Sequence, residues 1–561
     1  MFKKEIIDLV SKKTKLKKQE IEELIEIPRN PEMGDYAFPC FTLSKKYKKN
    51  PAEIAKEIVL ELKPKGNIEK IQEQGPYINF FIDKKALAKA LLEDINNYYG
   101  ETKEGKNKKI VIDFSAPNIG KPMHVGHIRS TILGDSLLRI YHFLGYKPIG
   151  INYLGDIGLH IGKLIVAYEL WLNKKALKDN PVKELLRLYV KFNKEEESEF
   201  VEGQEPDYEG NEWTQKAREK LRLLELGDKE AEKIWDDIRE ASGKGFDKVY
   251  KILNIEFHET TGQSKFSEAG KEIVLNATKK GIAKTEKDGA IYVEFDNLPK
   301  KYILKSDGTA SYITQDIAAA VERYKKHNFE KMLYVTDFRQ ELHFQQLFEI
   351  LKKFGYNFSN KCEHIGFGTV NFGKEIIASR KGKVILLEEV LEKTIEKAKQ
   401  SIKSRKTKGN PEKVGVAAIK YAILRNEPIK DVQFSWKEAL NFEGETGPYI
   451  QYSYARASSI LRKSKKKPKL TMPTKLEDKE ILLIKKIQDF PKEVKRAARD
   501  FNPSIIANYA YKLAQIFNEF YHDTKVIGTK EEEFRLKLIE AFRITIKNAL
   551  YLLGIDVMEE M

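Results

Sequence analysis

The spacing of apolar residues predicts a strand followed by a helix near residue 115. KIVIDF at 109–114 is a short apolar run, which predicts a buried strand. From Val125 to about Leu144 the apolar residues recur at helical spacing, which predicts a helix. These residues include Ile128, Ile132, Leu137, Ile140 and Tyr141. The segment SAPNIGKPMHVGHIRST at 115–131 therefore contains the turn from the strand into the helix.

The first 100 residues show the pattern of a separate α+β domain. Helical spacing predicts helices near 3–11, 16–25, 51–63 and 84–95. The run GPYINFFI at 75–82 predicts a strand. The polar segment GETKEGKNK at 100–108 reads as a linker that ends this domain.

The next part of the chain predicts an α/β core with an insertion. Long charged helices between about 165 and 300 predict an inserted domain, and we interpret its acidic stretch at 195–210 as a solvated loop rather than a metal site. At 301–365 strand and helix signals alternate, which predicts a parallel, doubly wound sheet. In order, these signals are KYILKS, TASYITQDIAAAVERYKK, KMLYVTD and a helix through 341–354.

After about residue 385 the pattern is almost entirely helical and predicts a bundle. The last two long helices carry apolar stripes. The stripes include Ile506, Leu513, Phe517 and Phe520 in the first helix, and Leu538, Phe542 and Ala549 in the second. The predicted domains are thus 1–100, an α/β core at 109–385 with an insertion at about 165–300, a helical connection at 386–440, and a helical domain at 441–561.

Composition narrows the class of protein. Cys40 and Cys362 are the only cysteines and form no CxxC motif, which argues against a disulfide scaffold or a cysteine-built zinc site. No stretch approaches the roughly 20 apolar residues of a membrane span, and the charged N-terminus is unlike a signal peptide, so we expect a cytoplasmic protein. The net charge of +16 suits a nucleic-acid partner or, equally, the Lys- and Glu-rich surface of a heat-adapted protein.

The strand-to-helix turn carries the residues of a phosphate site. Backbone N–H groups at a helix start have no helical partner, and the helix dipole there favours an anion. Lys121 and the imidazoles of His124 and His127 add side-chain donors. The turn lacks GxxxxGK[ST] and is therefore not a P-loop. A lone histidine is more often a core or capping residue, but two that flank a glycine at this turn favour binding of a phosphate chain.

The sequence His124-Val125-Gly126-His127 resembles the HIGH signature of class I aminoacyl-tRNA synthetases. Its longer context, SAPNIGKPMHVGHIRSTILGD, is similar to the form in archaeal- and bacterial-type arginyl-tRNA synthetases, and the resemblance covers nearly the whole chain. The other matching segments are GDYAFPCFTLSKK at 34–46, NYLGDIGLHIG at 152–162, YITQDIAAAVERY at 312–324, RQELHFQQLFEIL at 339–351, ASRKGKVILLEEVL at 378–391 and FEGETGPYIQYSYARASSI at 442–460.

This resemblance implies a fold and an activity. The implied fold is α/β: a Rossmann-type parallel-sheet catalytic core with an inserted domain, an N-terminal α+β module that contacts tRNA, and a C-terminal all-α anticodon-binding bundle. The implied activity is that of an arginine–tRNA ligase, which forms arginyl-adenylate from arginine and ATP and transfers arginine to the 3′-terminal adenosine of tRNA(Arg), releasing AMP and pyrophosphate. ATP implies Mg²⁺, for which the sequence shows no dedicated ligand set, and no structural zinc is expected. Family members are usually monomers that need bound tRNA before they activate arginine.

The resemblance also assigns residues to catalysis and ATP binding. The residues of the turn with this role are Lys121, His124, Gly126 and His127. They would position the triphosphate and neutralise its charge, while Gly126 leaves room for the adenine and ribose. His343 and Gln346 would line the nucleotide pocket, or equally form the polar face of an amphipathic helix.

A second phosphate-binding loop is expected at IASRKG, residues 377–382. This loop departs from the KMSKS signature of class I enzymes, because Ser379 replaces the usual second lysine. Family precedent lets Lys121 take that place. Arg380 and Lys381 remain as cationic donors on a loop that contains glycine.

The resemblance places the arginine substrate near a predicted helix. Tyr312 and Asp316 are four residues apart and share one helix face, where they would stack on the guanidinium group and form an ion pair with it. Asn118 and Gln340 match family positions that hold the amino and carboxylate groups. Gln263, in FHETTGQS, stands where the family usually has glutamate, so it supplies a hydrogen-bond acceptor without charge and Asp316 would carry the ion pair alone.

Contacts with tRNA are expected in both terminal domains. Single-stranded anticodon bases are best held by stacking and by hydrogen bonds to their edges. Aromatic residues offer stacking surfaces there, although some of them must pack in cores. The resemblance assigns tRNA contacts to Tyr77, Asn79 and Phe80 at the N-terminal end and to Tyr449, Tyr452 and Arg456 at the C-terminal end.

Two other classes of protein are alternatives, because they would share the HxGH turn motif or the high net positive charge. One is another HxGH nucleotidyltransferase that adenylylates a small acid or a mononucleotide. The other is a synthetase-like protein that binds RNA without catalysis. Pyrophosphate exchange with ATP, arginine and tRNA distinguishes all three.

Overall fold

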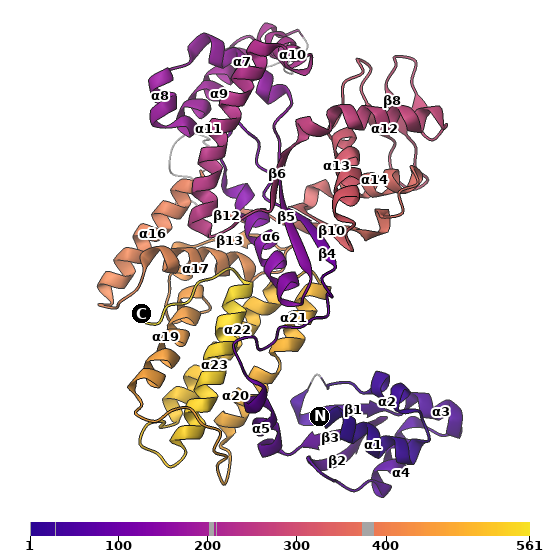
Figure 1. The fold of residues 1–561 in the computed structure, drawn as a ribbon, viewed down its shortest axis with the longest axis vertical. Coiled ribbons are helices and arrows are strands. Elements are labelled where there is room, and N and C mark those ends of the chain that lie inside the picture. Colours follow the sequence, from indigo (N-terminus) through magenta and orange to yellow (C-terminus); the bar gives the residue numbers. More distant parts are fainter. Residues whose placement is uncertain (1, 29, 201–206, 209, 373–385) are drawn as a thin grey trace. The chain divides into compact units, whose positions relative to one another are not determined.

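The structure is a computed structural model that describes residues 2–28, 30–200, 207–208, 210–372 and 386–561. The chain folds into two compact units, here called the N-terminal unit and the core unit (Figure 1). The N-terminal unit comprises Met1–Asn97, Ile460–Gln488 and Ile516–Phe542, and the core unit comprises Tyr98–Ser459, Asp489–Gln515 and Arg543–Met561.

The N-terminal unit contains a three-stranded antiparallel sheet in the order β1-β3-β2. Its strands are β1 (Tyr36–Pro39), β2 (Ile68–Gln74) and β3 (Tyr77–Ile82), and its first helices are α1 (Phe2–Thr14), α2 (Lys18–Leu24), α3 (Phe41–Tyr47), α4 (Pro51–Glu61) and α5 (Lys84–Asp94). The helices predicted near 3–11, 16–25, 51–63 and 84–95 and the strand predicted at 75–82 are confirmed as α1, α2, α4, α5 and β3. The pattern missed β2 because its side chains are mostly exposed, which leaves no alternation of apolar and polar residues to detect.

The core unit is built on a five-stranded parallel sheet in the order β11-β10-β4-β5-β6. Its strands are β4 (Lys109–Asp113), β5 (Lys147–Leu154), β6 (Glu259–Gly262), β10 (Lys331–Asp337) and β11 (Cys362–Phe367). From β4 the chain first adds strands on one side and then returns to add β10 and β11 on the other. The strand order therefore reverses between β4 and β10, which leaves a crevice at the carboxyl ends of these strands. The predicted Rossmann-type parallel sheet is confirmed.

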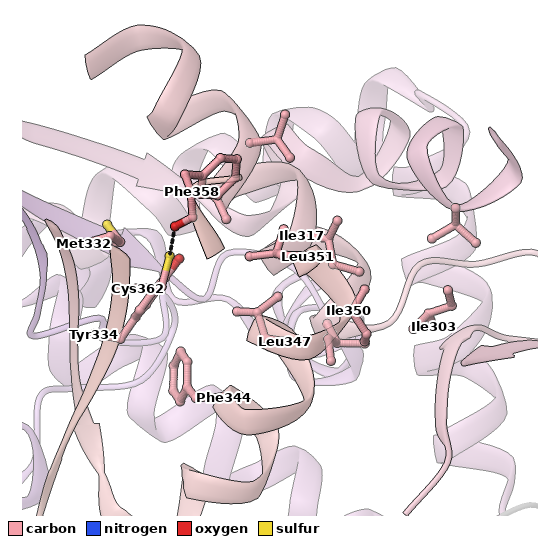
Figure 2. Packing of buried hydrophobic residues seen from close by; sticks show 14 of the residues in the cluster. Ile303, Ile317, Met332, Tyr334, Phe344, Leu347, Ile350, Leu351, Phe358 and Cys362 are labelled. Carbon is pink, nitrogen blue, oxygen red and sulfur yellow. Dashed lines mark hydrogen bonds between the residues drawn. The ribbon is translucent and has the colours of Figure 1, made fainter. Parts of the chain in front are cut away.

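Helices cover both faces of this sheet. On one face, α12 (Ser267–Lys279), α13 (Tyr312–His327) and α14 (Glu341–Lys353) pack on the strands through a buried apolar cluster (Figure 2). Because strand side chains alternate between faces, Val111 belongs to this cluster, whereas Ile110 and Ile112 face the helix α6 (Val125–Phe143) on the other side.

The region predicted as an insertion contains two kinds of structure. Its first part is a group of helices (Figure 1). These helices are α7 (Leu159–Trp171), α8 (Lys174–Asp179), α9 (Pro181–Ser198), α10 (Glu212–Glu225) and α11 (Lys229–Leu253). The chain then returns to the parallel sheet as β6, which pairs with β5. The segment predicted as an insertion at about 165–300 therefore includes one strand of the core sheet.

The strand predicted at KYILKS was expected in the parallel sheet, and this expectation is wrong. It forms β9 (Lys301–Leu304), which pairs antiparallel with β8 (Ile291–Val293), and β8 pairs with β7 (Lys284–Thr285). The short segment 294–300 joins β8 to β9. A connection of this length suits an antiparallel hairpin, whereas a parallel pair needs a crossover of about a dozen residues or more.

Residues 386–561 are almost entirely helical, as predicted. Their helices are α16 (Leu387–Ser404), α17 (Pro411–Leu424), α18 (Trp436–Ala439), α19 (Gly447–Lys463), α20 (Asp478–Gln488), α21 (Phe490–Arg499), α22 (Ser504–Asp523) and α23 (Glu532–Leu552). Every apolar stripe residue predicted in α22 and α23 is buried, and the rings of Phe517 and Phe542 stack with their centroids 3.8 Å apart. In the part of the chain that the structure describes, no helix has both the length and the apolar character that crossing a membrane would require.

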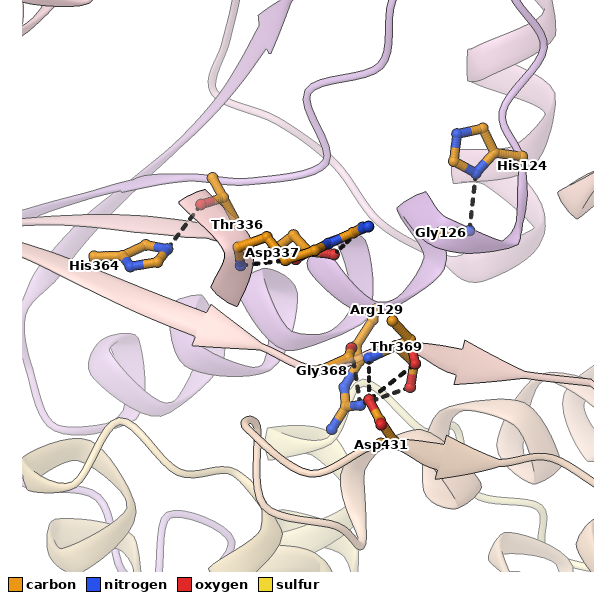
Figure 3. Close-up of polar contacts among 10 residues, drawn as sticks. His124, Gly126, Arg129, Thr336, Asp337, His364, Gly368, Thr369 and Asp431 are labelled. Atoms are coloured by element: carbon orange, nitrogen blue, oxygen red, sulfur yellow. Dashed lines mark hydrogen bonds and ion pairs between the residues drawn. The ribbon is translucent and has the colours of Figure 1, made fainter. Parts of the chain in front are cut away.

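Two buried cations fix α6 in the core unit. Arg129 donates to the carbonyl oxygens of Gly368 and Thr369 at 3.0 and 3.1 Å (Figure 3). It also donates to the Glu427 carbonyl oxygen at 3.0 Å. Near the middle of the helix, Lys420 lies 3.5 Å from the Asp135 carboxylate, and it donates to the Gly554 carbonyl oxygen at 2.8 Å. The helix that begins at the HxGH motif is therefore held by the residues just before β12 (Val370–Asn371), by Glu427, by Lys420 of α17 and by the C-terminal segment at Gly554.

Candidate active site

A cavity of about 610 Å³ opens at the carboxyl ends of the parallel strands, where the strand order reverses. The ends of β4, β5, β10 and β11 contribute Asp113, Tyr153, Asp337 and Phe367 to its wall. The cavity also brings together predicted site residues that are far apart in the sequence. These are Asn118, His124, Gly126, His127, Gln263, Tyr312, Asp316, Gln340 and His343.

The two histidines of the motif cap the start of α6. His124 is the N-cap residue, and its Nδ1 accepts a hydrogen bond from the Gly126 N–H at 3.0 Å (Figure 3). His127 Nδ1 accepts from the His124 N–H at 3.2 Å. A neutral imidazole that accepts at Nδ1 carries its proton on Nε2. The cap therefore fixes both rings in the tautomer that has an Nε2–H donor.

Burial keeps both rings neutral. Burial lowers the pKa of His127 to about 3, and the nearby His124 ring adds to this effect. Burial and the charge of Lys121 also lower the pKa of His124. At neutral pH the motif thus offers two uncharged donors at the positive end of a helix dipole.

The His124 ring leaves no room for a side chain at position 126, which explains the glycine there. A Cβ atom at this position would lie 2.7 Å from Cε1 and 2.8 Å from Nδ1 of His124. Contacts this short force the ring to move and break the cap. The sequence had suggested room for adenine and ribose as the reason for this glycine; the fold adds a local reason.

Lys121 lies in the same turn but does not line this cavity. Its Nζ lies 4.6 Å from the centroid of the Tyr189 ring on α9, a cation–π contact. It lines a smaller cavity together with Val182, Leu185 and Phe246 of the helical region. Lys121, the lysine of this turn, is therefore held against the face of the Tyr189 ring.

The lining of the cavity also includes acidic and acceptor groups. Asp316 Oδ2 and His343 Nε2 form a 2.7 Å hydrogen bond, while Tyr312, one turn earlier on α13, is 58% exposed. The Oε1 atom of Gln263 is buried and, among the described residues, has no hydrogen-bond partner. The Asn118 side chain lies against Gly155, where a Cβ would be 1.8 Å from its Oδ1.

A buried ion pair lies at the end of β4, beside the cavity. Arg323 of α13 and Asp113 at the end of β4 are 2.8 Å apart and both are buried. The rings of Tyr153 and Tyr334 lie 4.7 and 5.9 Å from the Arg323 guanidinium carbon. The charges of Asp113 and Arg323 compensate each other. Asp316 forms no ion pair with a lysine or arginine among the described residues.

Four lining residues within the strands, at or near their carboxyl ends, were not among the site residues predicted from the sequence. Asp113, Tyr153 and Tyr334 line the cavity, as does Asp337, which accepts three hydrogen bonds from Arg339 at 2.8–2.9 Å (Figure 3). Their position at or near the carboxyl ends of parallel strands is the signal that would have identified them.

Some predicted residues lie elsewhere. Gln346 is buried and donates to the Pro299 carbonyl oxygen at 2.9 Å, so it does not line the cavity. Arg380 and Lys381 fall outside the described residues. In the described part of the chain, no group of three or more His, Cys, Asp or Glu side chains is arranged to hold a metal ion.

The segments predicted to contact tRNA differ in exposure. In β3, Tyr77 is half-buried and packs edge-on against Phe41, whose side chain is 51% exposed, while Asn79 and Phe80 are buried in the N-terminal unit. In α19, Arg456 lies 4.8 Å from the Tyr452 ring, and Tyr449 lies 5.7 Å from the ring of Tyr511.

Comparison with known proteins matches the whole chain. The family model described as "tRNA synthetases class I (R), catalytic domain" matches residues 86–436. An arginyl tRNA synthetase N-terminal domain model matches 1–82, and a DALR anticodon binding domain model matches 450–561. The arginine–tRNA ligases of Halothermothrix orenii and Clostridium perfringens are 42% and 41% identical, with all of each chain covered.

Solved structures agree in fold. An arginyl-tRNA synthetase of Thermus thermophilus superposes with a TM-score of 0.79 at 23% identity over the full length of both chains. That of Plasmodium falciparum gives 0.75 at 26% identity, covering 96% of this chain and 94% of its own. By its catalytic-domain match and its full-length relatives, the chain belongs to the arginine–tRNA ligase family of class I tRNA synthetases.

Proposed function

We propose that the cavity holds ATP and arginine side by side, with the triphosphate at the 118–127 turn and the guanidinium group at Asp316. As an arginine–tRNA ligase, the chain activates arginine with ATP and transfers it to tRNA(Arg). The observation that carries the proposal is one cavity lined both by the capped HxGH histidines and by Asp316. The arginine carboxylate would then attack the α-phosphorus and release pyrophosphate, and a hydroxyl of the 3′-terminal adenosine of tRNA would displace AMP.

The phosphate end would work through preorganised donors. The Nε2–H groups of His124 and His127 and the N-terminus of α6 are fixed before ATP binds, so they cost no reorganisation in the transition state. Lys121, with a flexible stem, would leave the Tyr189 ring and supply a positive charge to the departing pyrophosphate. We assign the same role to Arg380 and Lys381. Mg²⁺ would accompany ATP and be held mainly by its phosphate oxygens.

The residues at the arginine end would recognise the charge and the planar shape of the guanidinium group. Asp316 pairs with the guanidinium group, Tyr312 stacks on it, and Gln263 accepts a further hydrogen bond. Asn118 and Gln340 would hold the amino and carboxylate groups. For tRNA, we assign stacking to Tyr77 and to the α19 residues Tyr449, Tyr452 and Arg456. We further propose that the enzyme acts as a monomer in the cytoplasm.

The direct test is ATP–pyrophosphate exchange by the purified chain. We expect exchange that requires both arginine and tRNA(Arg), and none when lysine replaces arginine, because a single ammonium leaves the acceptors of the pocket poorly paired. No exchange under any combination, or equal exchange with another amino acid, would contradict the proposal.

Substituting Lys121 tests the phosphate end. We expect Lys121→Ala to lower the exchange rate by about 100- to 1,000-fold, because a donor to the transition state is lost. Affinity for tRNA, measured by filter binding, should be nearly unchanged. Lys183→Ala, an exposed lysine on the same helix as Tyr189, is the matched control and should retain activity. Equal loss of exchange and tRNA affinity would reject the assigned role.

Substituting His127 tests whether the imidazole acts as a neutral donor. Asparagine keeps a side-chain oxygen that can accept from the His124 N–H but lacks the Nε2–H donor. We expect His127→Asn to slow exchange by about 100-fold. Since burial lowers the pKa of His127 to about 3, the ratio of wild-type to variant rates should stay constant between about pH 6 and 8. A ratio that grows toward pH 6 would instead indicate an imidazolium cation.

Substituting Asp316 tests the arginine end. Asp316→Asn removes the charge that pairs with the guanidinium group, and a hydrogen bond between charged groups contributes about 1.5–3 kcal/mol. We therefore expect the KM for arginine to rise by about 10- to 100-fold, with little change in the KM for ATP. Glu322→Gln, on the same helix but outside the cavity, is the matched control. An unchanged KM for arginine would refute this pocket.

A further inference from the structure

The contact with His343 is the one hydrogen bond of the Asp316 carboxylate among the described residues. His343 Nε2 lies 2.7 Å from Asp316 Oδ2. The side chains are 23% and 16% exposed, so the contact is partly shielded from water. Because a carboxylate can only accept, the imidazole donates from Nε2. The bond therefore fixes both the rotamer of the carboxylate and the tautomer of the ring.

The fold holds His343 in place for this contact. His343 is the third residue of α14, next to Phe344, and the two rings meet edge-on with their centroids 5.3 Å apart. Phe344 belongs to the buried cluster that joins α13 and α14 to the sheet (Figure 2). The two helices that carry Asp316 and His343 thus pack through a common core, which sets the distance between the two side chains.

The hydrogen bond leaves one oxygen of Asp316 available. Oδ2 is occupied by His343, whereas Oδ1 has no hydrogen-bond partner in the described part of the chain. A guanidinium group presents parallel N–H donors and often pairs with both oxygens of one carboxylate. In this cavity such a bidentate pair would compete with His343 for Oδ2.

We infer that His343 is a positioning residue that holds Asp316 Oδ2, so that Asp316 Oδ1 and Gln263 Oε1 together accept the guanidinium N–H groups of arginine. This inference rests on the proposed function, which places arginine at Asp316. The second acceptor is the buried amide oxygen of Gln263, which lines the same cavity and has no partner among the described residues. Two acceptors on separate elements suit the planar, spread N–H donors of a guanidinium group, whereas an ammonium group must make all of its hydrogen bonds from one nitrogen.

This assignment differs from the role expected from the sequence, where His343 lines the nucleotide pocket. A nucleotide contact predicts a change in the KM for ATP. A positioning role predicts a change in the KM for arginine only, with ATP binding and folding unaffected.

The test compares His343 variants in the full-length enzyme with saturating tRNA(Arg). His343→Leu keeps bulk and removes the donor, and we expect the KM for arginine to rise by about tenfold, while kcat and the KM for ATP change little. His343→Gln places a side-chain N–H donor near the position of Nε2 and should restore most of the loss. Gln345→Ala, an exposed position on the same helix, is the matched control.

The outcomes separate the inference from the function on which it rests. If Asp316→Asn raises the KM for arginine but His343→Leu does not, the inference is overturned and the arginine pocket stands. A rise in the KM for ATP, or failure of His343→Gln to restore arginine binding, also overturns it. If His343→Leu fails to fold, His343→Asn and His343→Gln are compared instead. A raised KM for arginine in His343→Asn, together with a value near wild type in His343→Gln, supports the inference. Equal KM values in the two variants contradict it. If Asp316→Asn itself leaves the KM for arginine unchanged, the proposed arginine pocket is refuted, and the inference about His343 is refuted with it.

Discussion

The N-terminal cap of α6 is the interaction on which the site depends. The first backbone N–H groups of a helix need partners, and here the Nδ1 atoms of His124 and His127 accept from two backbone N–H groups of this turn. This demand fixes the tautomer of both rings. The same residues that complete the helix therefore hold their Nε2–H donors ready for an anion. The cap of the helix and the proposed binding of phosphate thus fall to the same pair of side chains.

The rest of the core unit makes this arrangement rigid. The reversal of strand order between β4 and β10 creates the crevice, and the buried contacts of Arg129 and Lys420 fix the helix that reaches it. Burial also lowers the pKa of His127, so the donors are neutral. In the proposed site, the helix dipole and Lys121 would attract the triphosphate, while the histidines would orient it.

Local patterns in the sequence were enough to predict much of this. The run at 109–114, the helical spacing after Val125 and the HxGH motif predicted β4, α6 and the turn between them. The helical spacing of Tyr312 and Asp316 predicted that both face one site, and they do line one cavity.

Features that depend on tertiary packing were not predictable in this way. The contact of Lys121 with Tyr189 and the inward turn of Gln346 depend on elements far away in the sequence. The pair formed by Asp316 and His343 likewise depends on how α13 meets α14. The antiparallel pairing of β9 was missed because a four-residue apolar run does not specify its partner.

A crystal structure with a non-hydrolysable ATP analogue and arginine bound tests the central claim most directly. The account predicts phosphate oxygens within about 3.2 Å of the Nε2 atoms of both His124 and His127, with the Nδ1 atoms still accepting from the backbone. A triphosphate bound away from the 118–127 turn, or rings rotated so that Nδ1 faces the phosphates, would contradict it.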